Sequence, residues 1–216
     1  MFTSEGDELI ARNTASWGTE FTFEVNDLKA GHYYLMIPRW SAYGSYVLTT
    51  SITSNPIAID TEPNNTIDQP LSVQLNQSVT GHLGYFFSSY GDMDTQDWYV
   101  LTTTESGKLS INVTAEDPLR VNNLILVDQY GNTVLTTGTW GKEATVYKNN
   151  LLPGTYYIQV PRWSGYGAYT LSTSFVQAPD ADTEPNDLQG EAQVIQLSDT
   201  VYARIGYEKV GSVDLS

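Results

Sequence analysis

The sequence contains no cysteine, which excludes disulfide bonds, thiolate catalysis and cysteine-ligated zinc. Basic residues are also scarce, because 10 Lys and Arg stand against 25 Asp and Glu, giving a formal net charge of −15. Such an acidic chain repels nucleic acid and anionic membranes and attracts cations. No apolar run approaches the roughly 20 residues of a membrane span. We therefore expect no nucleic-acid partner and no membrane span.

The N-terminal residues lack the charged and apolar regions of a signal peptide. We expect either that such a signal was removed or that the sequence is an excerpt from a longer chain. The missing cysteines are compatible with a secreted bacterial protein that avoids dependence on redox conditions.

Catalytic motifs are absent as well. The chain has only two histidines, His32 and His82, and neither stands beside a catalytic Ser or Asp motif. There is no Gly-x-Ser-x-Gly elbow, His-Glu-x-x-His pair, phosphate-binding loop or dinucleotide fingerprint. A glycosidase-like carboxylate pair stays open because acids are numerous, but these acids cluster as metal ligands would. We predict that the protein is not an enzyme.

Stretches of Ala, Leu, Glu and Lys at helical spacing are missing too, whereas Tyr, Thr, Val, Ile and Trp recur. Short alternating segments are bounded by turn sequences such as Glu-Ser-Gly, Tyr-Gly-Asn and Leu-Pro-Gly. About eight such segments predict an all-β fold, an antiparallel β-sandwich of jelly-roll type. The segments are 71–75, 97–103, 109–113, 124–128, 133–137, 144–147, 155–160 and 168–175.

An internal repeat organises the chain. GHYYLMIPRWSAYGSYVLTT at 31–50 matches GTYYIQVPRWSGYGAYTLST at 154–173 without a gap, and the copies lie about 120 residues apart. DTEPNN at 60–65 likewise matches DTEPND at 182–187. The repeat therefore starts at DTEPN and closes with the RWS-x-YG-x-Y segment.

This register predicts one complete unit flanked by two half units. Half a sandwich leaves apolar faces and unpaired strand edges in water. We expect the two halves to pack against each other within the chain, or against complementary halves of identical subunits in a head-to-tail assembly. The alternative is that the sequence is a truncated piece of a longer chain. The predicted boundaries are 1–55 (C-terminal half), 56–59 (linker), 60–178 (complete unit), 179–181 (linker) and 182–216 (N-terminal half of a following unit).

Four motifs occur in order within the complete unit: Glu-Pro-Asn, an Asp-rich turn leading into Asp-Trp-Tyr, Gly-x-Leu-x-Ile, and Leu-x-x-Gly-x-Tyr-Tyr-Ile-x-Val followed by Gly-x-Tyr-x-Leu. This order resembles the bacterial pre-peptidase C-terminal domain, a β-sandwich module found beside secreted peptidases and collagenases. The resemblance covers the complete unit and, through the internal match, both halves. It implies a secreted or cell-surface module that often binds calcium, serves targeting, stability or surface assembly, and performs no chemistry.

Two acidic clusters form a candidate cation site. In an extended segment, side chains at i, i+2 and i+4 face the same way, so carboxylates and an amide around Glu-Pro-Asn can converge. A second cluster lies in a turn that leads into a strand, and the two together offer enough oxygen for calcium, which takes six to eight oxygen ligands. The clusters are Asp60, Glu62 and Asn64, and Asp92, Asp94 and Asp97.

The resemblance implies a calcium ligand set drawn from both clusters. It comprises Asp60, Glu62, Asn64, Asn65, Asp94 and Asp97, with Ser89 as a further oxygen ligand. The counterparts in the following unit are Asp182, Glu184, Asn186, Asp187 and Asp214, and their last partner would fall beyond Ser216. The alternative is that Asp and Asn serve here only as turn formers.

The repeated Pro-Arg-Trp-Ser-x-Tyr-Gly-x-Tyr segment is the second functional lead. Exposed Trp and Tyr stack on sugar rings or on collagen, and Arg and Trp are also enriched at subunit interfaces. The candidate ligand or interface residues are Arg39, Trp40, Tyr43, Arg162, Trp163 and Tyr166. The structural alternative places the last tyrosines, Tyr46 and Tyr169, in the core or at a corner, and it also places Trp98 in the core.

Two functions follow from these patterns. The first is a structural, adhesive or surface-assembly array of calcium-binding repeats. The second is an accessory module that targets a secreted peptidase or glycoside hydrolase to polysaccharide or collagen.

Overall fold

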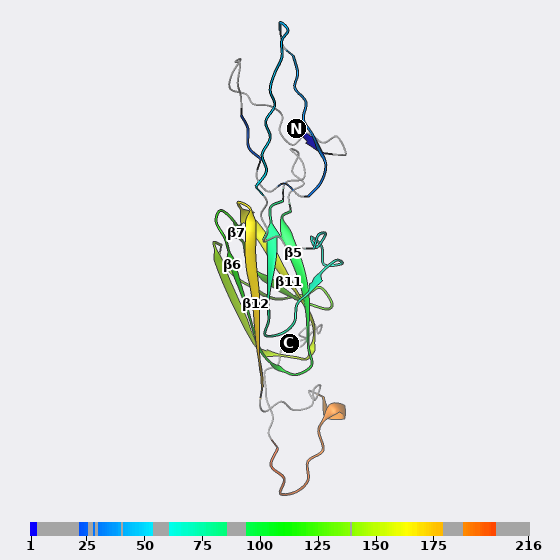
Figure 1. Cartoon of the computed structure of the whole chain (residues 1–216). Helices are drawn as coiled ribbons and strands as arrows, with labels where there is room; N and C mark the ends of the chain where they lie inside the picture. Colours follow the sequence, from blue (N-terminus) through cyan, green and yellow to red (C-terminus); the bar gives the residue numbers. More distant parts are fainter. Residues whose placement is uncertain are drawn as a thin grey trace.

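The computed structural model describes residues 1–3, 22–25, 28, 30–39, 41–53, 61–85, 94–138, 140–178 and 188–201. Within these ranges the regular structure is strand, apart from one 3₁₀ turn, η1 (Gln189–Glu191). Figure 1 shows two sheets packed face to face in the middle of the chain. The first sheet has the order β10 (Glu143–Leu151), β6 (Gly107–Ala115), β12 (Gly167–Gln177) and β4 (Ser78–Leu83).

The second sheet contains six strands. Neighbouring strands are antiparallel except for the parallel pair β3 and β5. The strand β7 (Arg120–Val121) lies beside one end of β11. The order of the others is β3 (Leu71–Ser72), β5 (Gln96–Thr103), β11 (Gly154–Ser164), β8 (Ile125–Asp128) and β9 (Thr133–Thr136).

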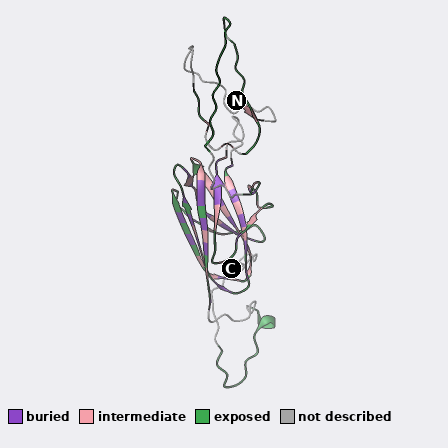
Figure 2. Ribbon diagram, viewed as in Figure 1, coloured by how far each residue is buried: buried purple, intermediate pink, exposed green. Residues whose placement is uncertain are grey.

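Alternation of side chains explains why these segments form a sandwich. Along β6, Leu109, Ile111 and Val113 are buried, while Ser110 and Asn112 between them are half-buried. This period of two places one face of each strand in the core and the other toward water. Figure 2 shows the buried positions concentrated on the sandwich strands. The apolar area removed from water between the sheets provides the main stabilisation of the fold.

The predicted all-β antiparallel sandwich is confirmed, and each of the eight predicted segments overlaps a strand. Within the described part of residues 60–178, two strands were not predicted, β4 and the short β7. In β4 the sequence Ser-Val-Thr-Gly-His-Leu lacks apolar alternation, yet Gly81, His82 and Leu83 are all buried. Pairing with β12 along its whole length places β4 in the sheet.

Local polar contacts organise the turns. Asp128 at the end of β8 accepts hydrogen bonds from the backbone N–H groups of Tyr130 (2.8 Å) and Asn132 (2.9 Å) and from Asn132 Nδ2 (2.9 Å). Burial alone would raise the pKa of Asp128, but the hydrogen bonds from Asn132, Tyr130 and Gly131 outweigh it and lower the pKa. The carboxylate therefore stays ionised and holds the predicted Tyr-Gly-Asn turn.

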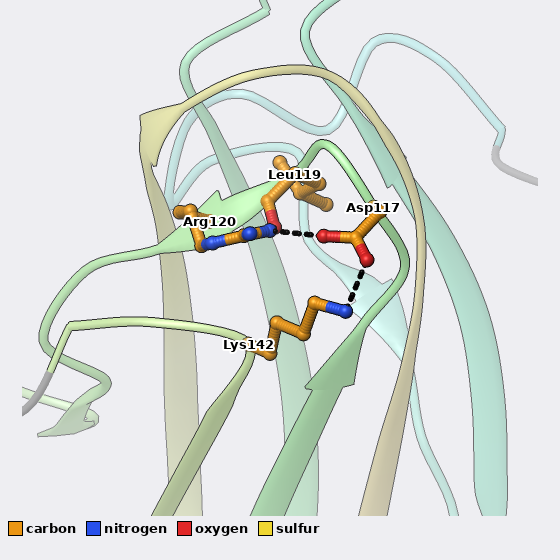
Figure 3. A network of polar contacts seen from close by, with 4 residues as sticks. All are labelled: Asp117, Leu119, Arg120 and Lys142. Carbon is orange, nitrogen blue, oxygen red and sulfur yellow. Dashed lines mark hydrogen bonds and ion pairs between the residues drawn. The ribbon is translucent and has the colours of Figure 1, made fainter.

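A second network fixes the loop between β6 and β7. Asp117 forms ion pairs with Arg120 Nη1 (2.9 Å) and with Nζ of Lys142, the residue just before β10 (Figure 3). The hydrogen bond from Lys142, which has the larger effect, and the one from Arg120 lower the pKa of Asp117 below its usual value. Arg120 Nη1 also donates to the Leu119 carbonyl oxygen (2.7 Å). These contacts hold the backbone around Pro118 in one position relative to β10.

Residues 31–50 repeat the sequence of 154–173 in the β11–β12 hairpin but not its environment. Figure 1 shows this part running away from the sandwich as extended chain, with β1 (Phe2–Thr3) paired to β2 (Tyr33–Tyr34). Tyr46 is 70% exposed, whereas its counterpart Tyr169 is 1% exposed. A core position, one of the two alternatives predicted for this tyrosine, is therefore confirmed for Tyr169 and wrong for Tyr46. The division of the chain into one complete and two half units stays a prediction.

Candidate metal centre

Three carboxylates from both predicted clusters meet at one end of β5. Glu62, Asp94 and Asp97 each present one carboxylate oxygen, and these three atoms lie within 4.8 Å of one another. Asp94 and Asp97 are 1% and 0% exposed, and Glu62 is half-buried. Three carboxylates so close together and so little hydrated repel one another unless a cation or protons offset their charge.

Hydrogen bonds to backbone carbonyl oxygens bring the two sequence-distant clusters together. Trp98 N–H in β5 donates to the Asn64 carbonyl oxygen (2.8 Å), and Gln96 Nε2 donates to the Asn65 carbonyl oxygen (2.9 Å). These bonds attach the Glu-Pro-Asn segment to the start of β5. Gly84 N–H, just after β4, donates to the Asp94 carbonyl oxygen (3.0 Å) and lies 3.2 Å from Asp94 Oδ2. The turn after β4 therefore supports the other side of the cluster.

Two asparagines complete the surroundings of Glu62. Glu62 Oε2 accepts from the Asn64 backbone N–H (3.3 Å) and from Asn65 Nδ2 (3.1 Å). Among the residues that the structure describes, the buried amide oxygen Asn65 Oδ1 has no hydrogen-bond partner. A buried acceptor without a donor is unfavourable unless another group satisfies it. The candidate donors at this cluster are all oxygen, the chemistry that calcium prefers.

A buried pair of tyrosines, Tyr99 and Tyr169, is hydrogen-bonded to Asp97. The Tyr169 hydroxyl in β12 donates to Asp97 Oδ2, and the hydroxyl oxygens of Tyr99 and Tyr169 lie 2.7 Å apart. Burial is the main cause that raises the pKa of Tyr169 well above its ordinary value, and the neighbouring Asp97 carboxylate and Tyr99 raise it further. Tyr169 is therefore a neutral O–H donor to Asp97 across the ordinary pH range.

The structure brings together Glu62, Asn65, Asp94 and Asp97 of the predicted ligand set, and it buries Asn64 beside them. The tyrosine pair was not predicted as part of this site. The remaining predicted ligands lie outside the described residues: Asp60, Ser89, Asp92, Asp182, Glu184, Asn186, Asp187 and Asp214.

The aromatic segment divides into structural and exposed residues. Arg162 Nε donates to the Gly165 carbonyl oxygen (2.5 Å) within its own turn, and Tyr166 is half-buried. Trp163 is 54% exposed and lies against Trp140, which is 66% exposed, with ring centroids 5.0 Å apart and planes tilted by 43°. Trp140 was missed because it lies outside the repeated segment; in the sequence it stands between Gly138 and Gly141.

The first copy of the segment is more exposed. Arg39 Nη1 donates to the Ala42 carbonyl oxygen (2.9 Å), and the Tyr43 side chain is almost wholly exposed. Trp40 lies outside the described residues. Trp98, predicted to be core, is half-buried beside the acidic cluster.

Comparisons with known proteins give likeness in fold only. No family model matches the chain. The pre-peptidase C-terminal domain of a collagenase from Bacillus anthracis is 22% identical over 53% of this chain and 100% of its own, with a TM-score of 0.42. A periplasmic inhibitor of g-type lysozyme, PliG from Aeromonas hydrophila, is 11% identical over 49% of this chain and 96% of its own, with a TM-score of 0.35.

A mannan binding module from Man5C is 15% identical over 45% of this chain and 82% of its own, with a TM-score of 0.26. The family predicted from the sequence motifs therefore stays a prediction. In the described part of the chain, no helix is long and apolar enough to cross a membrane.

Proposed function

We propose that this protein is a non-catalytic, extracellular β-sandwich module that binds calcium through Glu62, Asp94 and Asp97. The observation that carries the proposal is the convergence of these three carboxylates within 4.8 Å, two of them buried. Asn65 Oδ1 supplies a neutral oxygen beside them, and backbone carbonyls or water complete the six to eight oxygens that calcium takes. The net charge of −15 favours any cation over an anion.

The location of the site supports a structural role for the ion. The cluster joins the Glu-Pro-Asn segment, which opens the predicted repeat, to β5 in one sheet and, through Tyr169, to β12 in the other. Calcium bound here would cross-link the entry of the unit to both sheets. In an array of repeats or identical subunits, such a bond stiffens each unit and its junction with the preceding one, which suits a protein of surface assembly or adhesion.

Calcium binding by the whole chain tests this function. We expect isothermal titration calorimetry to detect a calcium site in the unaltered protein, and Asp94→Asn to weaken binding at least tenfold because one of three charged ligands is lost. Glu105→Gln, which removes one exposed charge elsewhere on the sandwich, is the matched control and should bind as the unaltered chain does. Equal affinities in all three proteins, or no binding in any of them, would contradict the proposal.

The paired tryptophans favour a second candidate function, binding of polysaccharide. Trp140 and Trp163 form an exposed aromatic surface of the kind on which sugar rings stack. Trp163→Ala and Trp140→Ala are each expected to abolish retention of the chain by an immobilised polysaccharide. Tyr130→Ala, which removes a single exposed aromatic ring, is the control and should leave retention unchanged. Retention that survives both tryptophan substitutions would exclude this surface.

A further inference from the structure

The hydroxyl groups of Tyr99 and Tyr169 form a directed chain that ends on Asp97. Tyr169 donates its only hydroxyl hydrogen to Asp97 Oδ2, so the hydrogen bond between the two tyrosines, 2.7 Å long, must have Tyr99 as its donor. Tyr99 lies in β5 and Tyr169 in β12, which belong to opposite sheets. Both side chains are 1% exposed. Two polar groups in the core therefore reach from both sheets toward one carboxylate.

A glycine in β4, Gly81, leaves the space that these hydroxyls occupy. Gly81 lies opposite Tyr169 in the β4–β12 ladder. A Cβ atom at Gly81 would lie 2.4 Å from the Tyr169 hydroxyl oxygen and 2.5 Å from that of Tyr99. Real Cβ atoms do not approach other heavy atoms so closely, so the absence of a side chain at Gly81 allows the pair to occupy its position.

We propose that Tyr169 is a positioning residue of the cation site: its hydroxyl bond fixes the orientation of the Asp97 carboxylate beside Glu62 and Asp94, and Tyr99 in turn orients Tyr169. The inference rests on the calcium-binding function proposed above. Outer partners of a metal ligand fix its orientation, and their loss reduces metal affinity about 10- to 100-fold. A cation bound to Asp97 is thereby connected to both sheets, to one through β5 and to the other through the Tyr169 hydroxyl in β12.

Substitution of single hydroxyls tests the inference on the full chain. Tyr169→Phe is expected to raise the calcium dissociation constant about 10- to 100-fold, and Tyr99→Phe to raise it by a smaller factor, because Tyr99 acts on Asp97 only through Tyr169. The matched control is Tyr156→Phe. The Tyr156 hydroxyl makes a comparable bond, to the Leu152 carbonyl oxygen (2.8 Å), but lies outside this chain of hydroxyls. It should lose stability and keep the calcium affinity of the unaltered chain.

If Tyr169 has a purely structural role, all three variants will be less stable but will bind calcium as tightly as the unaltered chain. That result would overturn the inference and leave the proposed calcium function intact. Absence of calcium binding in the unaltered chain would overturn both. If Tyr169→Phe does not fold, Tyr99→Phe decides: a raised dissociation constant supports the inference, and a constant equal to that of Tyr156→Phe overturns it.

Discussion

Replacing Gly165 by alanine is expected to lower the free energy of unfolding by about 3 kcal/mol. Gly165 has φ +70°, a conformation that costs an L-residue energy, and a Cβ atom there would lie 2.0 Å from the Pro118 carbonyl oxygen. That oxygen belongs to the loop that Asp117 ties to Arg120 and Lys142, so it moves only if these ion pairs also shift (Figure 3). Urea denaturation followed by tryptophan fluorescence measures the change.

The repeat supplies the control for Gly165. Ala42 occupies the corresponding position of the first copy and has φ 59°, so the turn itself accepts alanine. Ala42→Gly should change the free energy of unfolding by less than about 1 kcal/mol, because only the local backbone preference is altered. If Gly165→Ala were as mild as Ala42→Gly, close contact with Pro118 would not constrain the turn.

The second large effect is expected at Gly81. Alanine there would force its Cβ against the Tyr169 ring carbon Cζ (2.4 Å) and the hydroxyls of both core tyrosines. These rings are buried and cannot rotate away, so we expect a loss of about 3 kcal/mol in the free energy of unfolding. Because the displaced Tyr169 also holds Asp97, calcium affinity should fall in the same variant, as measured by calorimetry.

Gly138→Ala is the matched control for Gly81→Ala. Gly138 has open space at the Cβ position, so alanine there should change stability by less than about 1 kcal/mol and leave calcium binding intact. A Gly81→Ala protein as stable as the control would show that the tyrosine pair has room to move.

The strands could be predicted wherever burial follows alternation in the sequence. Leu109, Ile111 and Val113 alternate with polar residues, and they form the inner face of β6. β4 could not be predicted in this way, because its buried positions Gly81 and His82 carry no apolar side chain. Both residues pair with β12, Gly81 lies against the hydroxyls of Tyr169 and Tyr99, and His82 stacks on the Tyr85 ring with centroids 3.9 Å apart. These contacts do not follow from the local sequence.

The acidic cluster could be predicted in part. The recurrence of DTEPN and the Asp-rich turn identified Glu62, Asp94 and Asp97 as candidates, and the structure brings these three together. The contacts that join the two clusters are backbone bonds such as Trp98 N–H to the Asn64 carbonyl, which carry no side-chain signal. The support from Tyr169 was missed because a repeated tyrosine is equally consistent with simple packing.

A repeated sequence does not guarantee the same environment in this chain. Leu48 is 54% exposed and its counterpart Leu171 is 0% exposed, although both stand in the same repeated segment. Burial of Leu171 depends on β6 and β4, which flank β12 on its two sides. The second copy forms β11 and β12, whereas only Tyr33–Tyr34 form a strand in the described part of the first copy. Repetition in the sequence thus fixes neither strand formation nor burial, and the core forms only where the partner strands are present.

Thermal unfolding of the whole chain, in calcium and in chelator, tests the central claim most directly. A ligand that binds only the native state at 100 times its dissociation constant stabilises that state by about 2.7 kcal/mol. We predict that calcium raises the unfolding midpoint of the unaltered protein and of Glu105→Gln, and that it leaves the midpoint of the double variant Asp94→Asn, Asp97→Asn unchanged. A midpoint that does not respond to calcium in the unaltered chain, or that rises equally in the double variant, would contradict a calcium site at this cluster.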